Sequence, residues 1–197
     1  MPPPTTPRSA SPAEDQPSRV AALLSHWGFS RAGLLDNRRG EWWLIAQLVL
    51  LTTLLAPPLP PLAWVGLSWP WPWRAGGVML VLLGAVEALL ALRQLGTSLT
   101  PLPEPLPEGA LVTSGPYARC RHPLYRAILL GALGLAVLLG SLLHLLVGLA
   151  LAGLLGGKAR REERSLLRLH PAYADYQRQT AAILPRLPWL DWRAWGF

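Results

Sequence analysis

Residues 127–157 read AILLGALGLAVLLGSLLHLLVGLALAGLLGG and carry no formal charge over 31 residues. As one helix they would measure about 46 Å, well beyond the ~30 Å hydrocarbon core of a bilayer. Gly140-Ser141 lies near the middle and is a natural place for a turn. Cations flank the run at both ends: Arg119, Arg121 and Arg126 before it, and Lys158, Arg160 and Arg161 after it. The stretch therefore predicts a helical hairpin with both ends on one side of a membrane.

Two more apolar segments precede this hairpin, at residues 42–56 and 75–92. The second contains Glu87, whose carboxylate is expected to face the protein interior at that depth. Trp64, Trp69, Trp71 and Trp73 lie among prolines and predict an interfacial connection between the two segments. Residues 95–121 contain too many prolines for a long helix and are expected to form a loop.

The fold class that follows is all-α: a polytopic membrane protein with about four transmembrane helices, the C-terminal hairpin and cytosolic tail helices. Four crossings place the flanking arginines and both termini in the cytoplasm. Residues 1–20 predict a disordered Pro-rich tail without a signal peptide. Residues 21–94 predict an interfacial segment and the first two transmembrane helices, and residues 95–197 the catalytic region. Within it, residues 162–180 predict a helical tail interrupted near His170-Pro171.

The composition supports a membrane location. Hydrophobic residues make up 51% of the chain and charged residues only 15%, where a soluble protein has about a quarter. The net charge of +7 comes almost wholly from arginine. Arginine next to apolar segments indicates which ends of those segments lie on the cytoplasmic side, and it attracts anionic lipid. The sequence has no stripe of basic residues with interleaved aromatic residues, the pattern that would indicate nucleic-acid binding. One cysteine excludes an intramolecular disulfide, and no metal site is predicted.

Two polar motifs flank the hairpin and are expected to meet. Gly115-Pro-Tyr-Ala-Arg-Cys-Arg-His-Pro-Leu-Tyr125 precedes it, and Lys158-Ala-Arg-Arg-Glu-Glu-Arg164 closes it. The predicted topology brings both motifs and the 95–121 loop to one membrane face. Cations, carboxylates and aromatic rings at the mouth of a hairpin suit a ligand with separated opposite charges and an acceptor that arrives from the lipid.

These motifs, in this order around a charge-free hairpin, resemble the isoprenylcysteine carboxyl methyltransferase family, which is related to the phospholipid N-methyltransferases. Further matching pieces are Leu95-Gly-Thr-Ser-Leu-Thr100, Leu111-Val-Thr-Ser-Gly-Pro-Tyr117 and Tyr173-Ala-Asp-Tyr176. The resemblance implies a multi-pass enzyme that uses S-adenosylmethionine at a site open to the cytoplasm. It also implies a lipophilic acceptor that enters from the bilayer.

By the same resemblance, Arg121 and Glu163 are the expected catalytic residues. The expected cofactor-binding residues are Gly115, Tyr117, His122, Pro123, Tyr125, Glu162 and Tyr173. The chain has His170-Pro171 where the family usually has Phe-Gly, with one residue fewer before Tyr173. This spacing leaves open whether Glu162 or Glu163 is the functional carboxylate.

The chemistry of the acceptor also stays open. A carboxylate acceptor needs no base, and Arg121 could position it through paired hydrogen bonds. An amine or hydroxyl acceptor would use a base, for which Glu163 is the candidate. Two other functions compete with methyl transfer: a non-catalytic membrane scaffold or assembly protein, and an NADPH-dependent membrane lipid reductase.

Overall fold

A computed structural model describes residues 36–37, 39–60, 64, 68–106 and 109–184. The described residues are helical and contain no strand, which confirms the all-α prediction. The elements are α3 (Glu41–Thr53), α4 (Trp71–Leu95), η2 (Gly96–Ser98), η3 (Gly115–Ala118), α5 (Pro123–Leu139), α6 (Leu142–Leu169) and α7 (Tyr173–Gln179). The predicted N-terminal tail, the interfacial segment before residue 36 and the end of the chain after residue 184 lie outside the described residues.

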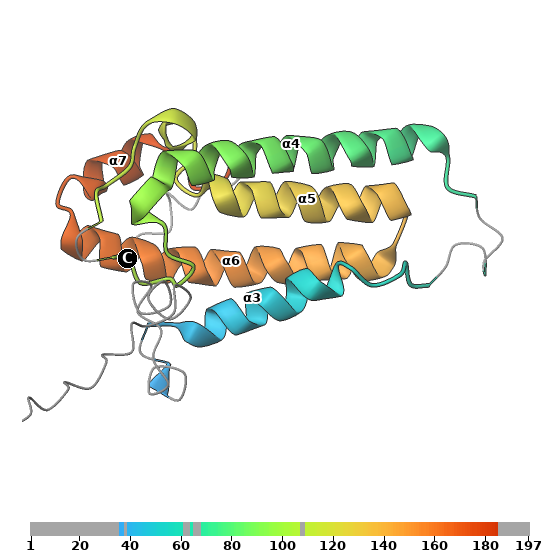
Figure 1. Ribbon diagram of the computed structural model, residues 1–197, viewed down its shortest axis with the longest axis horizontal. Coiled ribbons are helices and arrows are strands. Elements are labelled where there is room, and N and C mark those ends of the chain that lie inside the picture. The colour runs from blue at the N-terminus through green and yellow to red at the C-terminus, as the bar shows by residue number, and fades with distance from the viewer. Residues whose placement is uncertain (1–35, 38, 61–63, 65–67, 107–108, 185–197) are drawn as a thin grey trace, which may run out of the picture.

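The predicted hairpin is present, with α5 and α6 packed against each other (Figure 1). Gly140 ends α5 in a left-handed conformation, with φ of 58°, which glycine adopts without steric cost. Ser141 then begins α6, and its Oγ accepts a hydrogen bond from the backbone N–H of His144 at 3.5 Å. Because α6 has 28 residues and α5 has 17, α6 continues past the start of α5 and carries its charged last turns there.

Small residues let α4 and α5 approach closely. A Cβ added at Gly84 would lie 2.7 Å from the Ala127 carbonyl oxygen, and one added at Gly134 would lie 2.8 Å from Val81. No side chain fits in this space, so the two backbones are in direct contact, as in other membrane helix pairs with glycine interfaces. The close contact fixes how α4 sits on the hairpin.

On the other side of the hairpin, α3 packs against α6. Leu54, Val147 and Leu151 are buried together in one apolar cluster. His144 is fully buried beside them, with Nδ1 2.8 Å from Ser141 Oγ and Nε2 3.2 Å from the Leu54 carbonyl oxygen. Since both ring nitrogens have partners, His144 is a structural residue that joins the end of α3 to the hairpin turn.

Two of the helices, at Trp71–Ser98 and Leu142–Leu169, are long and apolar enough to cross a membrane, and α5 is a shorter apolar helix. Many large apolar side chains of α4 are exposed, among them Met79, Leu82 and Val86. In water such a surface would be costly, whereas lipid covers it.

Two predictions for the second apolar segment had different outcomes. Trp71 and Trp73 belong to α4, so their placement in the connection before it was wrong. The helix starts at Trp71 because Pro72 fits a first helical turn, where its missing N–H has no partner to lose. The prediction for Glu87 is confirmed: its Oε1 accepts a hydrogen bond from Arg126 Nε of α5 at 2.6 Å.

Candidate active site

The first motif is held in place by the chain that follows α7. The backbone N–H groups of Arg121 and His122 donate to the carbonyl oxygens of Ala181 and Ala182, at 2.9 and 3.1 Å. The Cys120 thiol donates to the Ala182 carbonyl at 2.9 Å, and burial raises the pKa of this thiol to about 11. Cys120 is therefore a neutral structural thiol that helps to fix the motif.

Arg121 and Glu163 form the buried ion pair at the centre of the site. Arg121 Nε donates to Glu163 Oε1 at 2.8 Å and Nη2 to Oε2 at 3.3 Å, and each residue is 3% exposed. Arg121 Nη1 donates to the carbonyl oxygens of Gln177 and Thr180, which belong to the tail. The guanidinium thus joins the start of the hairpin, the end of α6 and the tail.

The Glu163 carboxylate has further partners. His122 Nε2 lies 2.7 Å from its Oε1, and Gln177 Nε2 donates to its Oε2 at 2.9 Å. Both oxygens are therefore occupied by protein groups. A carboxylate in this state orients its neighbours and holds no position for a substrate proton.

Glu162, the adjacent residue on α6, has a different environment. Its Oε2 accepts a hydrogen bond from the Tyr125 hydroxyl at 2.7 Å, and its side chain is 30% exposed. The Tyr125 ring stacks on the His122 ring with centroids 5.1 Å apart and an interplanar angle of 4°. Residues of the first motif thus orient both glutamates, although only Glu162 is open toward solvent.

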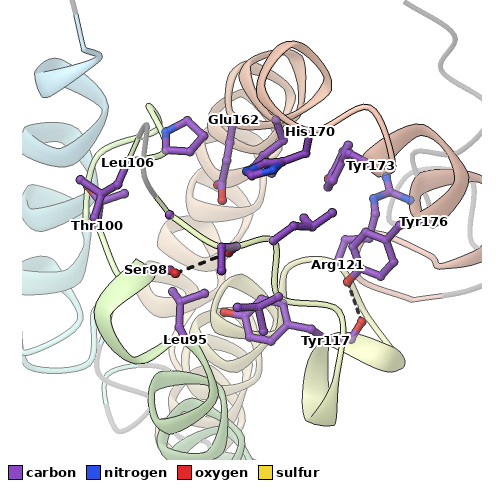
Figure 2. A pocket seen from close by; sticks show the side chains of 16 residues that line it. Leu95, Ser98, Thr100, Leu106, Tyr117, Arg121, Glu162, His170, Tyr173 and Tyr176 are labelled. Carbon is purple, nitrogen blue, oxygen red and sulfur yellow. Dashed lines mark hydrogen bonds between the residues drawn. The ribbon is translucent and has the colours of Figure 1, made fainter.

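A pocket opens above these groups and holds about 600 Å³ of empty space, counting its open mouth. Figure 2 shows Thr100 and Leu106 on one side of it and Tyr173 and Tyr176, at the α6–α7 corner, on the other. Its polar and aromatic lining consists of Ser98, Thr100, Tyr117, Arg121, Glu162, His170, Tyr173 and Tyr176. The mixture of polar, aromatic and apolar lining residues is typical of a small-molecule site.

Three tyrosines give this pocket its aromatic surface. Tyr173 and Tyr176 pack edge to face with centroids 5.7 Å apart, and the Tyr176 hydroxyl donates to the Tyr117 carbonyl at 2.6 Å. Burial raises the pKa of all three phenols well above the usual value, so they stay neutral at physiological pH. Neutral rings of this kind can accept a cation on their faces.

The structure divides the predicted site residues into three groups. Tyr117, Arg121, Glu162 and Tyr173 line the pocket. His122, Tyr125 and Glu163 are not part of that lining. Tyr125 and Glu163 contact it through their hydrogen bonds with Glu162 and Arg121, and His122 in turn contacts Glu163. Gly115 and Pro123 have backbone roles: Gly115 has a φ of 61° with Gln94 close to it, and Pro123 begins α5.

Several residues near the site were not predicted from sequence to belong to it, among them Ser98 and Thr100 of the pocket lining. His170 and Tyr176 line the pocket, and the spacing of Tyr176 three residues after Tyr173 could have indicated a shared helical face. Lys158 is buried, and its Nζ donates to Gln47 Oε1 at 2.7 Å and to the Pro101 carbonyl at 2.8 Å. This lysine therefore joins α6 to α3 and to the loop that forms one pocket wall.

Comparisons with known proteins match the part of the chain that contains both motifs. Residues 73–170, about half of the chain, match the family described as phospholipid methyltransferase. The cobalt-zinc-cadmium resistance protein CzcN of Cupriavidus metallidurans is 47% identical over 78 residues, or 39% of this chain and 36% of that protein. The nickel-cobalt-cadmium resistance protein NccN of Alcaligenes xylosoxydans xylosoxydans is 42% identical over 78 residues, or 39% of this chain and 37% of that protein.

The matched regions cover little more than a third of these two relatives. The family match, by contrast, includes most of α4, the first motif, the whole hairpin and both glutamates. The relationship predicted from the two motifs is therefore confirmed, and this chain belongs to the phospholipid methyltransferase family.

Proposed function

We propose that this protein is an S-adenosylmethionine-dependent membrane methyltransferase that acts on a lipophilic acceptor. The observation that carries the proposal is the pocket in which Glu162, Arg121 and three tyrosines face one space, at the end of a hairpin that lies within the family match. The acceptor we propose is an isoprenoid- or lipid-linked carboxylate, amine or hydroxyl.

The lining of the pocket fits the donor. S-adenosylmethionine supplies a methyl group activated by a positively charged sulfonium. Glu162 and the rings of Tyr117, Tyr173 and Tyr176 offer negative charge and aromatic faces to such a cation. Leu95, Leu106 and Leu166 give the same pocket apolar surface for a purine ring.

The residues contribute mainly by positioning. Holding two reactants in line can supply about 7–11 kcal/mol of a barrier. We propose that Arg121, which lines the pocket with its side chain buried against Glu163, acts on the acceptor or the donor carboxylate through its positive charge. Glu163 then acts as a positioning residue, because its two oxygens hold Arg121, His122 and Gln177.

For an acceptor that must lose a proton, Glu162 is the pocket carboxylate we assign as base. Oε2 of Glu162 accepts the Tyr125 hydroxyl, and among the described residues its Oε1 has no hydrogen-bond donor. An open oxygen in a pocket can accept a substrate proton directly or through one water. This assignment moves the basic role expected for Glu163 to its neighbour.

We also propose that α3, α4, α5 and α6 each cross the bilayer, with the pocket on the cytoplasmic side. The arginines near the pocket support this orientation through the positive-inside rule. Single cysteines at Thr113, beside the pocket, and at Ser68, at the far end of α4, test it in a Cys120→Ser background. Membrane-impermeant thiol reagents should label Ser68→Cys from outside only and Thr113→Cys from inside only. Labelling of both from one side would disprove the proposed topology.

The decisive experiment for the activity is equilibrium binding of S-adenosylhomocysteine to the purified protein in detergent. The protein should bind this product, whereas the reductase alternative requires binding of NADPH. Glu162→Gln should weaken binding of S-adenosylmethionine, whose sulfonium carries the positive charge that S-adenosylhomocysteine lacks, and Asp175→Asn, at an exposed position of α7, is the matched carboxylate control. Binding of NADPH without S-adenosylhomocysteine would overturn the proposal.

The acceptor is found by incubating lipid extracts with the enzyme and isotopically labelled donor. Mass spectrometry should then show a labelled lipid that is absent with Glu162→Gln. The relatives named for metal resistance share only part of their length with this chain, and the proposal covers methyl transfer alone.

A further inference from the structure

A groove lies between α4, α5 and the η3 turn, and it shares no lining residue with the methyl-transfer pocket. It holds about 1280 Å³ of empty space, counting its open mouth. The η3 turn contributes to both spaces, because Gly115 and Pro116 line the groove whereas Tyr117 lines the pocket. The two spaces are therefore neighbours at the same end of the molecule, with separate walls.

The wall that α4 gives to the groove is apolar and open. Leu83, Val86 and Leu90 follow one another at intervals of three and four residues, so they share one helical face. Each of these side chains is about half exposed. Leu130 of α5 adds to the same lining. From Leu83 to Leu90 the helix rises about 10 Å, and a wall of this kind suits a hydrocarbon chain that lies along α4.

Two of the three charged residues in the lining neutralise each other. Arg126 Nε donates to Glu87 Oε1 at 2.6 Å, and Arg126 Nη1 donates to the Ile183 carbonyl at 3.4 Å. The side chains of Arg126 and Glu87 are only 21% and 14% exposed. This ion pair closes part of the groove without adding net charge to it.

Arg119 is the third charged residue and leaves a formal charge of +1 on the lining. Its backbone N–H donates to the Pro116 carbonyl at 3.2 Å, which fixes Arg119 at the end of η3. The turn lies beside the last turn of α4, where Gln94 Nε2 donates to Ser114 Oγ at 2.8 Å. The Arg119 side chain is exposed, and it forms no ion pair or hydrogen bond with the residues that the structure describes. The groove thus ends on a cation that can bind an anion.

We propose that this groove binds an anionic membrane lipid, with one hydrocarbon chain along Leu83, Val86 and Leu90 and the charged head group at Arg119. A lipid carries its anion and its chain in this relative position, because the head group lies at the interface where the apolar part of α4 ends. A small soluble anion would leave the apolar wall uncovered. The site is separate from the methyl-transfer pocket and does not depend on the activity proposed there.

The head-group contact is tested by native mass spectrometry of the full chain in detergent, with phosphatidylglycerol and phosphatidylcholine as probes. The wild type should retain phosphatidylglycerol in preference to phosphatidylcholine. Arg119→Gln should lose about fivefold in affinity for phosphatidylglycerol and bind phosphatidylcholine as the wild type does. Arg119→Lys keeps the charge, and Arg93→Gln removes an exposed charge of α4 outside the groove. Both controls should stay within about twofold of the wild type.

The chain contact is tested by a matched pair of bulky substitutions on α4. Leu83 lines the groove, whereas its neighbour Leu82 is similarly exposed, at 60%, and does not line it. Leu83→Trp fills the groove and should weaken retention of both lipids by about fivefold or more. Leu82→Trp should leave retention unchanged, because its ring points to another part of the surface.

Four results would overturn the proposal. The first is an unchanged affinity of Arg119→Gln for phosphatidylglycerol, and the second is an equal effect of the two tryptophan substitutions. The third is displacement of the lipid by an equal concentration of inorganic phosphate, which would identify a free anion as the ligand. The fourth is a parallel loss of S-adenosylhomocysteine binding in Arg119→Gln, which would place this arginine in the methyl-transfer pocket. If Arg119→Gln does not fold, the tryptophan pair decides, and unchanged retention in Leu83→Trp counts against the proposal.

Discussion

Arg121 and Glu163 are 42 positions apart in sequence, yet they form a buried ion pair with Arg121 Nε 2.8 Å from Glu163 Oε1. The pair exists because the hairpin returns α6 to the start of α5. It also receives Gln177 from α7, so the helical tail is bound to the same two residues. Hairpin, motif and tail therefore form one unit beneath the pocket.

Replacing Glu163 by glutamine should destabilise the protein. The substitution leaves Arg121 buried without a counter-charge, at a cost of about 3 kcal/mol or more. For a chain of this length such a loss lowers the apparent Tm by about 6–12 °C. Thermal unfolding in detergent measures the shift. Asp175→Asn removes a carboxylate from an exposed pair and should leave the Tm unchanged. An unchanged Tm for Glu163→Gln would show that the ion pair does not hold the tail.

Removing the Tyr125 hydroxyl should weaken ligand binding with little effect on the fold. Tyr125→Phe keeps the ring stacked on His122 and removes the hydrogen bond to Glu162. The lost bond is worth about 1 kcal/mol, or roughly fivefold in affinity for S-adenosylmethionine, whose sulfonium Glu162 is proposed to face. Calorimetric titration measures this loss of affinity. Combined with Glu162→Gln, the substitution should add nothing further, and fully additive effects would mean that the two side chains act independently.

The contact between α4 and α5 should not tolerate a single methyl group. Gly84→Ala places a Cβ 2.7 Å from the Ala127 carbonyl oxygen, so the helices must separate, at an expected cost of about 1–3 kcal/mol. Gly76→Ala, on the same helix, meets nothing within 4 Å and should be neutral or slightly stabilising. The stabilities of the two variants are compared by unfolding both in the same detergent. Equal stability of the two would contradict the packing.

Lys158 should stabilise the 95–106 wall of the pocket through its two hydrogen bonds. Lys158→Met leaves Gln47 and the Pro101 carbonyl without their donor, at an expected cost of about 1.5–3 kcal/mol. Limited proteolysis should then cut the 95–106 loop faster than in the wild type. The matched control is Arg93→Met, which removes an exposed cation near the same loop. Unchanged cleavage in Lys158→Met would mean that the lysine does not hold the loop.

Cys120 should resist thiol reagents in the folded protein. With its pKa raised from 9.0 to about 11 by burial, the thiolate fraction at pH 8 falls roughly a hundredfold below that of an unperturbed thiol. The thiol is also fully buried, which blocks access. Maleimide labelling at pH 8 should be absent in native protein and complete after unfolding in denaturant. Rapid labelling of the native protein would show that the segment after α7 leaves Cys120 exposed.

The sequence alone was sufficient for the hairpin and its turn, because a 31-residue apolar run is too long for one crossing and contains one Gly-Ser pair near its middle. It also located the break at His170, since proline disfavours a helix at the preceding residue. The start of α4 was placed four residues late, because Pro72 was interpreted as part of a loop when it fits a first helical turn.

The meeting of the two polar motifs was also predictable, whereas the contacts within the candidate site were not. Charged motifs at both ends of one hairpin must meet once the hairpin forms, which located Arg121, Glu162 and Glu163 together. The partners of Lys158 come from α3 and from the Pro101 loop, and nothing in the local sequence specifies how those segments approach α6. Contacts between segments so far apart depend on packing of the whole molecule.

The order of residues and their hydrophobic pattern determined that this chain forms apolar helices and where these helices end. They also determined which polar motifs lie at the same end of the helical hairpin. Tertiary structure decided that Glu162 faces the pocket and Glu163 the buried arginine. Adjacent residues on a helix point about 100° apart, so the two glutamates face different surroundings. Which one faces the pocket depends on the rotation of α6 about its axis, and that rotation is set by the packing of α3 and α5 against it.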